Sequence, residues 1–272
     1  NELWGPVGWP TSHEAAVTLL IQPTQIVGHP LIYLPSVGST QDVARDQARA
    51  GAPEGLVVVA NKQTAGRGRL HHQWWAPAGT SLLLSILFRP SLIPSQTPRL
   101  TMICGLAVTN AISTVTGMEI GLKWPNDLLL KGKKLGGILA EAELSGHMLA
   151  YAIVGVGINV NLDFTTSGIP ELKETAISLS QALGKSVDRL VLLRALLLEL
   201  DTRYQRLRRG ELPHQEWSQR LVTLGQDVRV ITPEAVIQGR AVGVNAEGAL
   251  LIEHADGTQT TVWAGDVTML QA

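Results

Sequence analysis

Four apolar segments joined by short turns occupy the middle of the chain, between Ile120 and Val160. Their patterns predict strands, and the Lys131-Gly132 and Ser145-Gly146 steps are typical of tight hairpin connections. The segments are IGLKW, DLLL, KLGGILAEAE and HMLAYAIVGVGINV. This run of hairpins predicts a sheet with antiparallel neighbours at the centre of the fold.

Strands and helices precede and follow this region. Three more apolar runs are typical of strands: LIYL at 31–34, GLVVVANK at 55–62 and SLLLSILF at 81–88. A helix is expected to begin after Ser39, which forms a capping-box pattern with Asp42, and to end at Gly51. Two further helices are predicted over residues 98–116 and 187–210, because apolar residues recur there at helical spacing.

The two ends of the chain differ from its middle. The last part consists of short strand-like segments separated by turns, including an Asp-Gly hairpin signal, and predicts a small antiparallel β-barrel over residues 225–272. Residues 1–30 are rich in Pro and Gly and predict an N-terminal extension with one short helix, at 15–21, at most. The predicted fold is therefore α+β, with a mixed main domain over residues 31–224.

Composition and charge narrow the classes of function. The 272 residues are 45% hydrophobic and 17% charged, which is typical of a soluble globular protein. A net charge of -1 argues against general nucleic-acid affinity, so a bound anion should meet a local cluster of charge. Cys104 is the single cysteine, Arg194 interrupts the most apolar stretch, and the N-terminus has no signal core. We therefore expect a cytoplasmic protein without a membrane span.

Several common catalytic signatures are absent. The chain has no P-loop, no complete dinucleotide-binding glycine pattern and no G-x-S-x-G. The adjacent His71 and His72 cannot face one metal ion as an i, i+4 helical pair does, and they are expected at the loop surface. Cys104 falls within a predicted helix. The remaining chemistry lies in three polar clusters, each next to a predicted strand.

The first cluster is QTAGRGR at 63–69. Its glycines let the backbone approach a ligand and expose N–H donors, while Arg67 and Arg69 supply permanent positive charge suited to phosphate. A solvated turn is the ordinary alternative for such a segment. Trp74 and Trp75, which follow, are more typical of core or of a hydrophobic lid than of a platform for a ligand.

The second cluster surrounds the first central hairpin. Lys123, Asn126 and Asp127 lie at one end of it, and Lys134 lies on the return strand, just before a glycine pair where a ligand could come close. A carboxylate and an amide beside a phosphate site are plausible partners for Mg²⁺. The alternative for Asp127 is a structural ion pair with an arginine.

The third cluster is GVGINVN at 155–161. Asn159 follows a buried apolar strand, and Gly155 and Gly157 leave room beside it for a flat ring. The alternative is that Asn159 only closes a turn.

Together and in this order, the clusters resemble the biotin protein ligase family. The matching motifs are G-R-G-R-x-x-x-x-W at Gly66, Arg67, Gly68, Arg69 and Trp74, K-W-P-N-D at Lys123 to Asp127, K-L-x-G-I-L at Lys134 to Leu139, and G-x-G-x-N at Gly155 to Asn159, with Ser39-Thr40 and Gln63 ahead of them. The resemblance covers residues 31–270. It implies a class II synthetase-like biotin/lipoate ligase catalytic domain, with a mixed sheet and helices, followed by an SH3-like β-barrel.

The sequence departs from the family pattern at three places. His71 and His72 stand where many members have a second Gly-Arg pair, and Gln41 stands where asparagine is frequent. No winged helix-turn-helix is visible in residues 1–30. The expectation is a monofunctional ligase without a DNA partner.

The resemblance implies a reaction in two steps. The biotin carboxylate attacks the α-phosphate of ATP to give biotinyl-5′-AMP, and a lysine of a biotin carboxyl carrier protein then takes the biotinyl group. Arg69 and Lys134 are the implied catalytic residues, and Asp127 is the implied Mg²⁺ ligand. The implied biotin contacts are Ser39, Thr40, Gln41, Gln63, Gly66, Arg67, Gly68, Arg69, Lys134, Gly136 and Gly137. The implied ATP contacts are Arg67, Arg69, Trp74, Lys123, Asn126, Asp127, Lys134 and Asn159. Pairing of two copies through the central sheet is compatible with this family.

Two other functions remain as alternatives. A lipoate ligase or lipoyl transferase shares the general fold, but a transferase needs an acyl-accepting nucleophile, and Cys104 lies in a predicted helix. A non-catalytic biotin-sensing regulator would need a DNA-binding module. The G-R-G-R and K-W-P-N-D motifs favour the biotin ligase.

Overall fold

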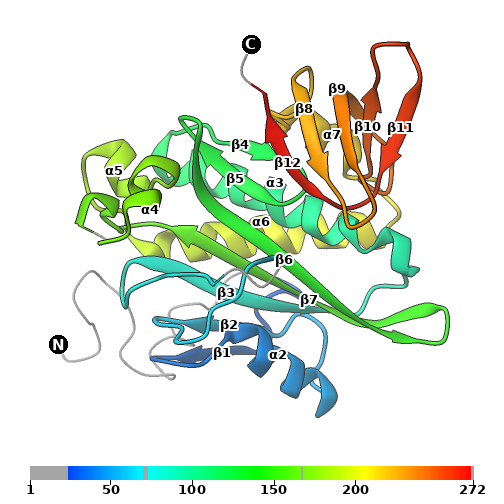
Figure 1. The fold of residues 1–272 in the computed structure, drawn as a ribbon. Helices are drawn as coiled ribbons and strands as arrows, with labels where there is room; N and C mark the ends of the chain where they lie inside the picture. The colour runs from blue at the N-terminus through cyan, green and yellow to red at the C-terminus, as the bar shows by residue number, and fades with distance from the viewer. Residues whose placement is uncertain (1–23, 70–72, 167, 271–272) are drawn as a thin grey trace.

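The computed structural model describes residues 24–69, 73–166 and 168–270. Its larger sheet has seven strands in the order β1-β2-β3-β7-β6-β5-β4, and β1 pairs with β2 in parallel, whereas the other neighbours are antiparallel. The strands are β1 (Leu31–Leu34), β2 (Val57–Ala60), β3 (Ser81–Phe88), β4 (Gly121–Lys123), β5 (Asp127–Leu130), β6 (Lys133–Ser145) and β7 (Met148–Asn159). Lys131 and Gly132 have φ of 51° and 76°, as the predicted tight turn requires. The predicted α+β class is confirmed (Figure 1).

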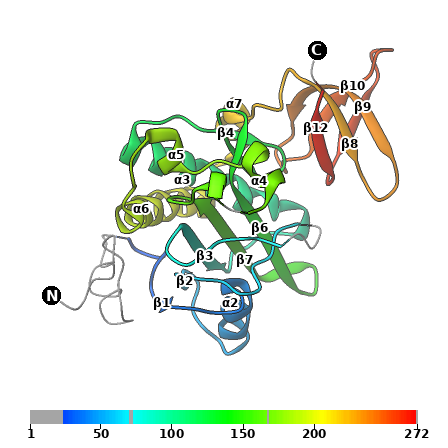
Figure 2. The same cartoon turned by 60° about the vertical axis from the view of Figure 1, so that its left-hand side comes forward.

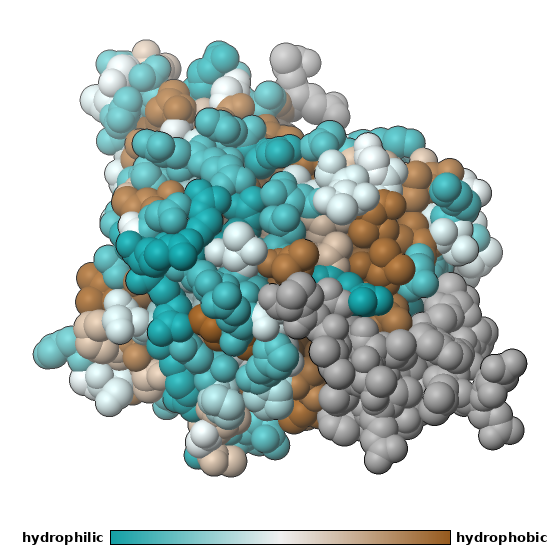
Figure 3. Space-filling model, turned by 180° about the vertical axis from the view of Figure 1, so that it is seen from behind, coloured by the Kyte–Doolittle hydropathy of each residue, from teal (hydrophilic) through white to brown (hydrophobic). Residues whose placement is uncertain are grey.

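Helices cover both faces of this sheet. On one face, α2 (Thr40–Arg49) packs its Ala44 and Ala48 against the β1–β2–β3 side. On the other face, α3 (Pro98–Thr116) and α6 (Arg189–Arg208) pack against each other and against the sheet. Seen from behind, the molecule is mostly hydrophilic, with a hydrophobic area on the right of the view (Figure 3). A mostly hydrophilic outer surface is typical of amphipathic helices whose apolar sides face a core.

The C-terminal strands form a separate antiparallel sheet in the order β11-β10-β9-β8-β12. They are β8 (Asp227–Ile231), β9 (Val236–Val244), β10 (Leu250–Glu253), β11 (Gln259–Val262) and β12 (Asp266–Met269). Val228 and Val230 are buried between exposed neighbours, so this sheet has one apolar face. Both views place it at one end of the molecule, with β12 as the strand nearest the larger sheet (Figures 1 and 2).

Side-chain contacts join the C-terminal sheet to the rest of the protein. The buried indole of Trp124 donates from Nε1 to the carbonyl oxygen of Gly248, at 2.8 Å. Arg99 on α3 forms an ion pair with Glu247, with 3.2 Å between Nη2 and Oε1. The short helix α7 (His214–Arg220), with buried Trp217, lies between the two sheets in the chain. These contacts hold the connection between β9 and β10 against α3 and the turn between β4 and β5.

The predicted long elements are confirmed, whereas several short helices and helical turns were missed. The helix over 98–116 matches α3, and α2 is capped by Ser39, although the expected capping box with Asp42 is wrong. The Ser39 hydroxyl accepts from the Gln41 N–H, whereas the Asp42 carboxylate accepts hydrogen bonds from Arg67 and Arg45. The missed elements are α4 (Pro170–Thr175), α5 (Leu179–Leu183), α7 and the 3-10 turns η2 (Pro94–Gln96) and η3 (Phe164–Thr166). The short helix expected at 15–21 lies outside the described residues.

Within the described ranges, no helix combines the length and the apolar character needed to cross a bilayer.

A buried carboxylate on α6 anchors the chain segment that leads into β1. Asp201 is 3% exposed, and its two oxygens accept from the backbone N–H groups of Gln25, Ile26 and Val27 at 2.9, 2.7 and 2.8 Å. It also accepts from Gln205 Nε2 at 2.7 Å. Because hydrogen bonds to a charged acceptor are stronger than neutral ones, this carboxylate fixes the approach to the sheet.

We expect Asp201→Ala to lower the free energy of unfolding by about 2–4 kcal/mol, since three partly buried backbone donors lose their acceptor. Urea denaturation followed by circular dichroism measures this loss. Asp46→Ala, on the exposed side of α2, is the matched control. A loss equal to that of the control would show that Asp201 does not anchor the segment.

Candidate active site

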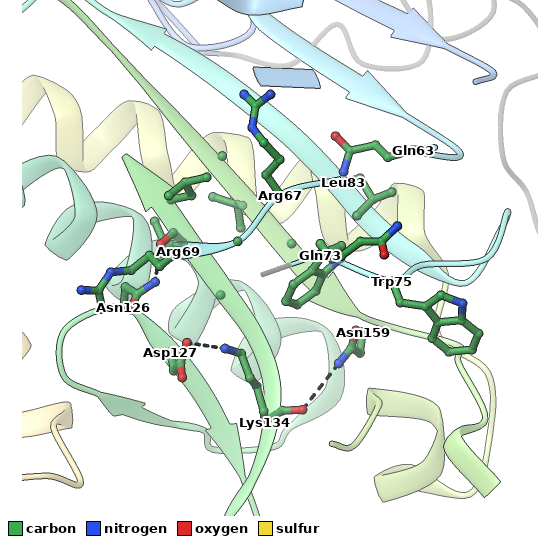
Figure 4. A pocket seen from close by; sticks show the side chains of 18 of the residues that line it. Gln63, Arg67, Arg69, Gln73, Trp75, Leu83, Asn126, Asp127, Lys134 and Asn159 are labelled. Atoms are coloured by element: carbon green, nitrogen blue, oxygen red, sulfur yellow. Dashed lines mark hydrogen bonds and ion pairs between the residues drawn. The ribbon is translucent and has the colours of Figure 1, made fainter. Parts of the chain in front are cut away.

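The site lies on the part of the sheet that α2 leaves uncovered. Side chains alternate along a strand, so every second residue of neighbouring strands faces the same side. The register aligns two rows on this side: Leu83, Gly157, Gly137 and Asp127, and next to it Ser85, Gly155 and Leu139. A cavity of about 370 Å³ lies over both rows. Its second wall is formed by the start of α2 and the glycine-rich segment (Figure 4).

A group of hydroxyl and amide side chains lines one end of the cavity. The Gln63 side-chain oxygen accepts from the Thr40 N–H at 2.7 Å and from the Thr40 hydroxyl at 3.0 Å. The Thr40 hydroxyl is also 2.8 Å from that of Ser85. Ser39 is buried as the cap of α2. This chain of contacts fixes three polar groups before any ligand arrives, which suits recognition of a neutral polar ring.

Gln41 carries a buried, unsatisfied acceptor beside this end of the site. Its Nε2 donates to the Leu139 carbonyl and to Glu141, both at 3.3 Å. Its Oε1 is buried and accepts no hydrogen bond within the described part of the chain. A Cβ at Gly155 would lie 3.0 Å from that oxygen, so the glycine makes room for it. A buried acceptor without a partner is costly, and a ligand N–H would satisfy it.

Arg67 is tied to α2. Its guanidinium makes two hydrogen bonds to Asp42, at 2.9 and 2.8 Å, and lies 3.7 Å from Glu141. Hydrogen bonding to Arg67 holds the pKa of Asp42 below its ordinary value. The loop closes on itself through an antiparallel bridge between Arg67 and Gln73, and the Trp74 N–H donates to the Gly66 carbonyl at 2.9 Å. The start of the glycine-rich segment is therefore fixed relative to α2.

Arg69 and Lys134 approach the cavity from different elements. Arg69 donates from Nη1 to Asn126 Oδ1 at 3.1 Å and from Nη2 to the Gly265 carbonyl at 3.2 Å. Lys134 on β6 forms an ion pair with Asp127, with 2.7 Å between Nζ and Oδ1 (Figure 4). Burial lowers the pKa of Arg69, while the negative charge of Asp127 acts in the opposite direction. Arg69 and Lys134 thus line the same cavity, and both interact with the negative charge of Asp127.

The observed partner of Asp127 corrects one alternative from the sequence. A structural ion pair with an arginine was considered, but the carboxylate pairs with Lys134. The amide of its neighbour Asn126 makes two hydrogen bonds: Nδ2 donates to the Ile138 carbonyl at 2.7 Å, and Oδ1 accepts from Arg69.

The Trp74 indole lies over a pair of glycines in the floor of the cavity. Gly137 and Gly157 are register partners on β6 and β7. A Cβ at Gly157 would be 2.9 Å from Trp74 Cε2, and one at Gly137 would be 3.8 Å from Cζ3. The indole can lie here only because residue 157 is a glycine and has no side chain. Its Nε1 is buried and has no hydrogen-bond partner among the described residues.

The other end of the cavity is apolar and was largely missed from the sequence. Trp75 packs against Phe164 with ring centroids 6.5 Å apart, and Leu172 and Ala176 complete this wall. Its members come from irregular segments, α4 and η3, where no periodic pattern marks them. Asn159 lies beside it and donates to the Ile177 carbonyl at 3.3 Å.

Most of the predicted site residues line this one cavity. They are Ser39, Thr40, Gln41, Gln63, Arg67, Gly68, Arg69, Trp74, Asn126, Asp127, Lys134, Gly137 and Asn159. Three others are not among its lining residues, for packing reasons. Gly66 lies against Trp74, Gly136 lies under Leu128, and Lys123 borders a smaller hollow beside Trp217. His71 and His72 lie outside the described residues.

Some lining residues were not among those predicted. They include Gln73, Leu83, Leu84, Ser85, Ile138, Leu139, Val156 and Asp266. Strand alternation supplies a signal for Leu83 and Ser85, since they share the face of Gly157 and Gly155. The sequence has no signal for Asp266, because it comes from the C-terminal sheet.

Known proteins with the same features identify the family. Residues 33–159 match the Biotin/lipoate A/B protein ligase family, and residues 223–270 match the Biotin protein ligase C terminal domain. The chain is 37% identical over 251 residues to the bifunctional ligase/repressor BirA of Bacillus subtilis. The aligned region covers 90% of this chain and 76% of the relative. It is 34% identical over 242 residues to the biotin--[acetyl-CoA-carboxylase] ligase of Mycobacterium tuberculosis, with 86% of each chain covered.

A solved structure agrees. The biotin protein ligase from Aquifex aeolicus in complex with biotin and ATP has a TM-score of 0.74 at 30% identity, covering 89% of this chain and 99% of that one. The chain therefore belongs to the biotin protein ligase family, as its motifs predicted. By class it is an ATP-dependent ligase.

We expect Gly157→Ala to lower the free energy of unfolding by about 1–3 kcal/mol, because its methyl group overlaps the Trp74 indole. Chemical denaturation measures the loss. In a Trp74→Ala background most of the loss should disappear. Gly243→Ala, where a Cβ meets only Leu251 Cδ1 at 3.7 Å, is the control. An equal loss with and without Trp74 would refute the contact.

Proposed function

We propose that this protein activates biotin with ATP to biotinyl-5′-AMP and transfers the biotinyl group to a lysine of a biotin carboxyl carrier protein domain. The observation that supports it most strongly is the meeting of Arg69 and Lys134 in one cavity, between a polar end and an apolar end. The Aquifex aeolicus relative binds biotin and ATP, and the relative from Leishmania major was solved with biotinyl-5-AMP.

The first step joins two anions, a carboxylate and the α-phosphate of ATP. Their repulsion falls when fixed cations face the point of bond formation in a site that excludes water. Lys134 and Arg69 supply these cations, and each is held in place by acidic or amide partners. The carboxylate oxygen attacks phosphorus, the bond to pyrophosphate breaks, and the cations stabilise the charge on the non-bridging oxygens.

Biotin fits the polar end. Its ureido ring is a neutral group with N–H donors and one carbonyl, and Ser39, Thr40 and Gln63 present hydroxyl and amide groups there. Gln41 lines the same end and adds a further amide side chain there. Arg69 and Lys134 line the same cavity. With the ureido ring at the polar end, the carboxylate end of biotin would extend toward these two cations.

The nucleotide fits the apolar end. The wall of Trp75, Phe164 and Leu172 suits a purine base, and Asn159 lies beside it. The α-phosphate then falls between the base and the biotin carboxylate, at Arg69 and Lys134. The Trp74 indole over the glycine pair would exclude water from this junction.

Magnesium fits at Asp127. Mg²⁺ is usually bound by one or two carboxylates together with substrate phosphates and water, and Asp127 retains one oxygen that is not paired with Lys134. The Asn126 oxygen accepts one hydrogen bond from Arg69, so Asp127 supplies the negative charge that the metal needs. When bound, the metal would neutralise phosphate charge.

The second step transfers the biotinyl group to an amine. The carrier lysine attacks the carbonyl carbon of the mixed anhydride, the bond to the phosphate breaks, AMP leaves and the amine loses a proton. The acceptor must reach the cavity from solvent, so a lysine at the tip of a small folded domain has the right shape.

Incubating a biotin carboxyl carrier domain with this protein, biotin and MgATP tests the whole proposal. Mass spectrometry should show one biotinyl group on one lysine, and none when ATP is omitted. Lipoate in place of biotin is the substrate control. An unmodified carrier, or lipoate transferred in preference to biotin, would overturn the proposal.

We expect Lys134→Ala to lower biotin-dependent ATP–pyrophosphate exchange by about a hundredfold or more, the scale seen when a fixed transition-state donor is removed. Lys133→Ala is the matched control, since that side chain reaches the Lys173 carbonyl at 3.1 Å, outside the cavity. Equal exchange rates for the two variants would remove Lys134 from the mechanism.

A further inference from the structure

The C-terminal part of the chain reaches the active site at two neighbouring residues. The carbonyl oxygen of Gly265 accepts from Arg69 Nη2 at 3.2 Å, and Asp266 lines the cavity beside Arg69. Asp266 is the first residue of β12, the strand of this sheet nearest the larger sheet, and Gly265 immediately precedes it (Figure 2). Residues 196 positions apart in the chain thus meet at one guanidinium.

Glycine at position 265 allows this approach. A Cβ there would lie 2.6 Å from Val230 Cγ1 and 3.0 Å from the Ile231 carbonyl oxygen. The backbone can therefore lie directly on β8, and Asp266 becomes the register partner of Ile231. Buried Val228 and Val267 hold the two strands together. The position of the Gly265 carbonyl is consequently set by the packing of the C-terminal sheet.

Arg69 depends on partners outside its own segment. Gly68 precedes it, and glycine leaves the backbone free to adopt many conformations, which does little to orient a long side chain. Asn126 holds one terminal nitrogen and Gly265 the other, which fixes the plane of the guanidinium. Asp266 adds a negative charge nearby that opposes the lowering of the Arg69 pKa by burial.

We infer that Gly265 and Asp266 are positioning groups, through which the C-terminal sheet orients Arg69 for the joining of carboxylate and α-phosphate. This rests on the proposed role of Arg69. Asp266 acts on Arg69 and takes no part in bond formation itself. Asn126 holds one side of the guanidinium, and the second hold on Arg69 comes from the residues at the start of β12.

The arrangement predicts dependence between Asp266 and Arg69. If Asp266 acts through the guanidinium, its removal matters only while the guanidinium is present. A double-mutant cycle measures this dependence, because a group with a separate structural role would lose the same factor in both backgrounds.

The test measures biotin-dependent ATP–pyrophosphate exchange in the full chain, for Asp266→Asn, Arg69→Ala and the double variant. Asp266→Asn should slow exchange by about tenfold, since a small misplacement of a catalytic group has effects of this size or larger. In the Arg69→Ala background the same change should have no further effect. Asp266→Glu, which keeps the carboxylate, should recover most of the rate.

Two controls come from the same sheet. Asp227→Asn removes an exposed carboxylate from β8, and it should leave the rate unchanged. Gly265→Ala should slow exchange at least as much as Asp266→Asn, whereas Gly243→Ala should not, because only the first overlaps β8. Circular dichroism melting of each variant identifies any that fails to fold, and Asp266→Asn alone then decides the outcome.

Three results would overturn the inference. They are an Asp266→Asn rate equal to that of Asp227→Asn, the same loss in the Arg69→Ala background, or a raised Mg²⁺ requirement in both backgrounds, which would make Asp266 a metal ligand. Normal exchange by Arg69→Ala itself would instead refute the proposed function of that residue.

Discussion

The register between β6 and β7 is the constraint on which the site depends. It places Gly137 opposite Gly157 and Leu139 opposite Gly155, and the β3 pairing adds Leu83 and Ser85 to the same rows. A shift by one residue would turn this face of the strand toward the α3 and α6 core. The glycines then leave a shallow floor in the middle of a sheet, where side chains would otherwise fill the space.

Charge in the cavity is balanced before substrates arrive. Lys134 pairs with Asp127, Arg67 pairs with Asp42, and Arg69 lies near Asp127. Partly buried cations without such partners would be unfavourable, and side chains left free would need to be ordered during the reaction. The same acidic partners therefore lower the cost of holding cations in a hollow and fix where they point. An incoming anion meets groups that are already oriented.

The sequence predicted the long elements and most of the cavity lining, because periodicity and glycine turns are local signals. The α3 helix, the central hairpins and the clusters around Arg69 and Lys134 follow from such signals. The apolar wall at Phe164 and Leu172 was missed, since α4 and η3 are short and have no repeat. Asp266 was missed for another reason: its position depends on how a second sheet packs against the first. The capping box at Ser39 failed because Arg67 competes for Asp42.

The central claim is that Arg69 and Lys134 act together on the bond between a carboxyl group and the α-phosphate. A crystal structure with a non-hydrolysable analogue of biotinyl-5′-AMP measures this directly. We expect Lys134 Nζ and an Arg69 guanidinium nitrogen each within hydrogen-bonding distance, about 2.7–3.2 Å, of oxygens at the linkage. A complex in which either group points away from the linkage, with the analogue fully bound, would contradict the account.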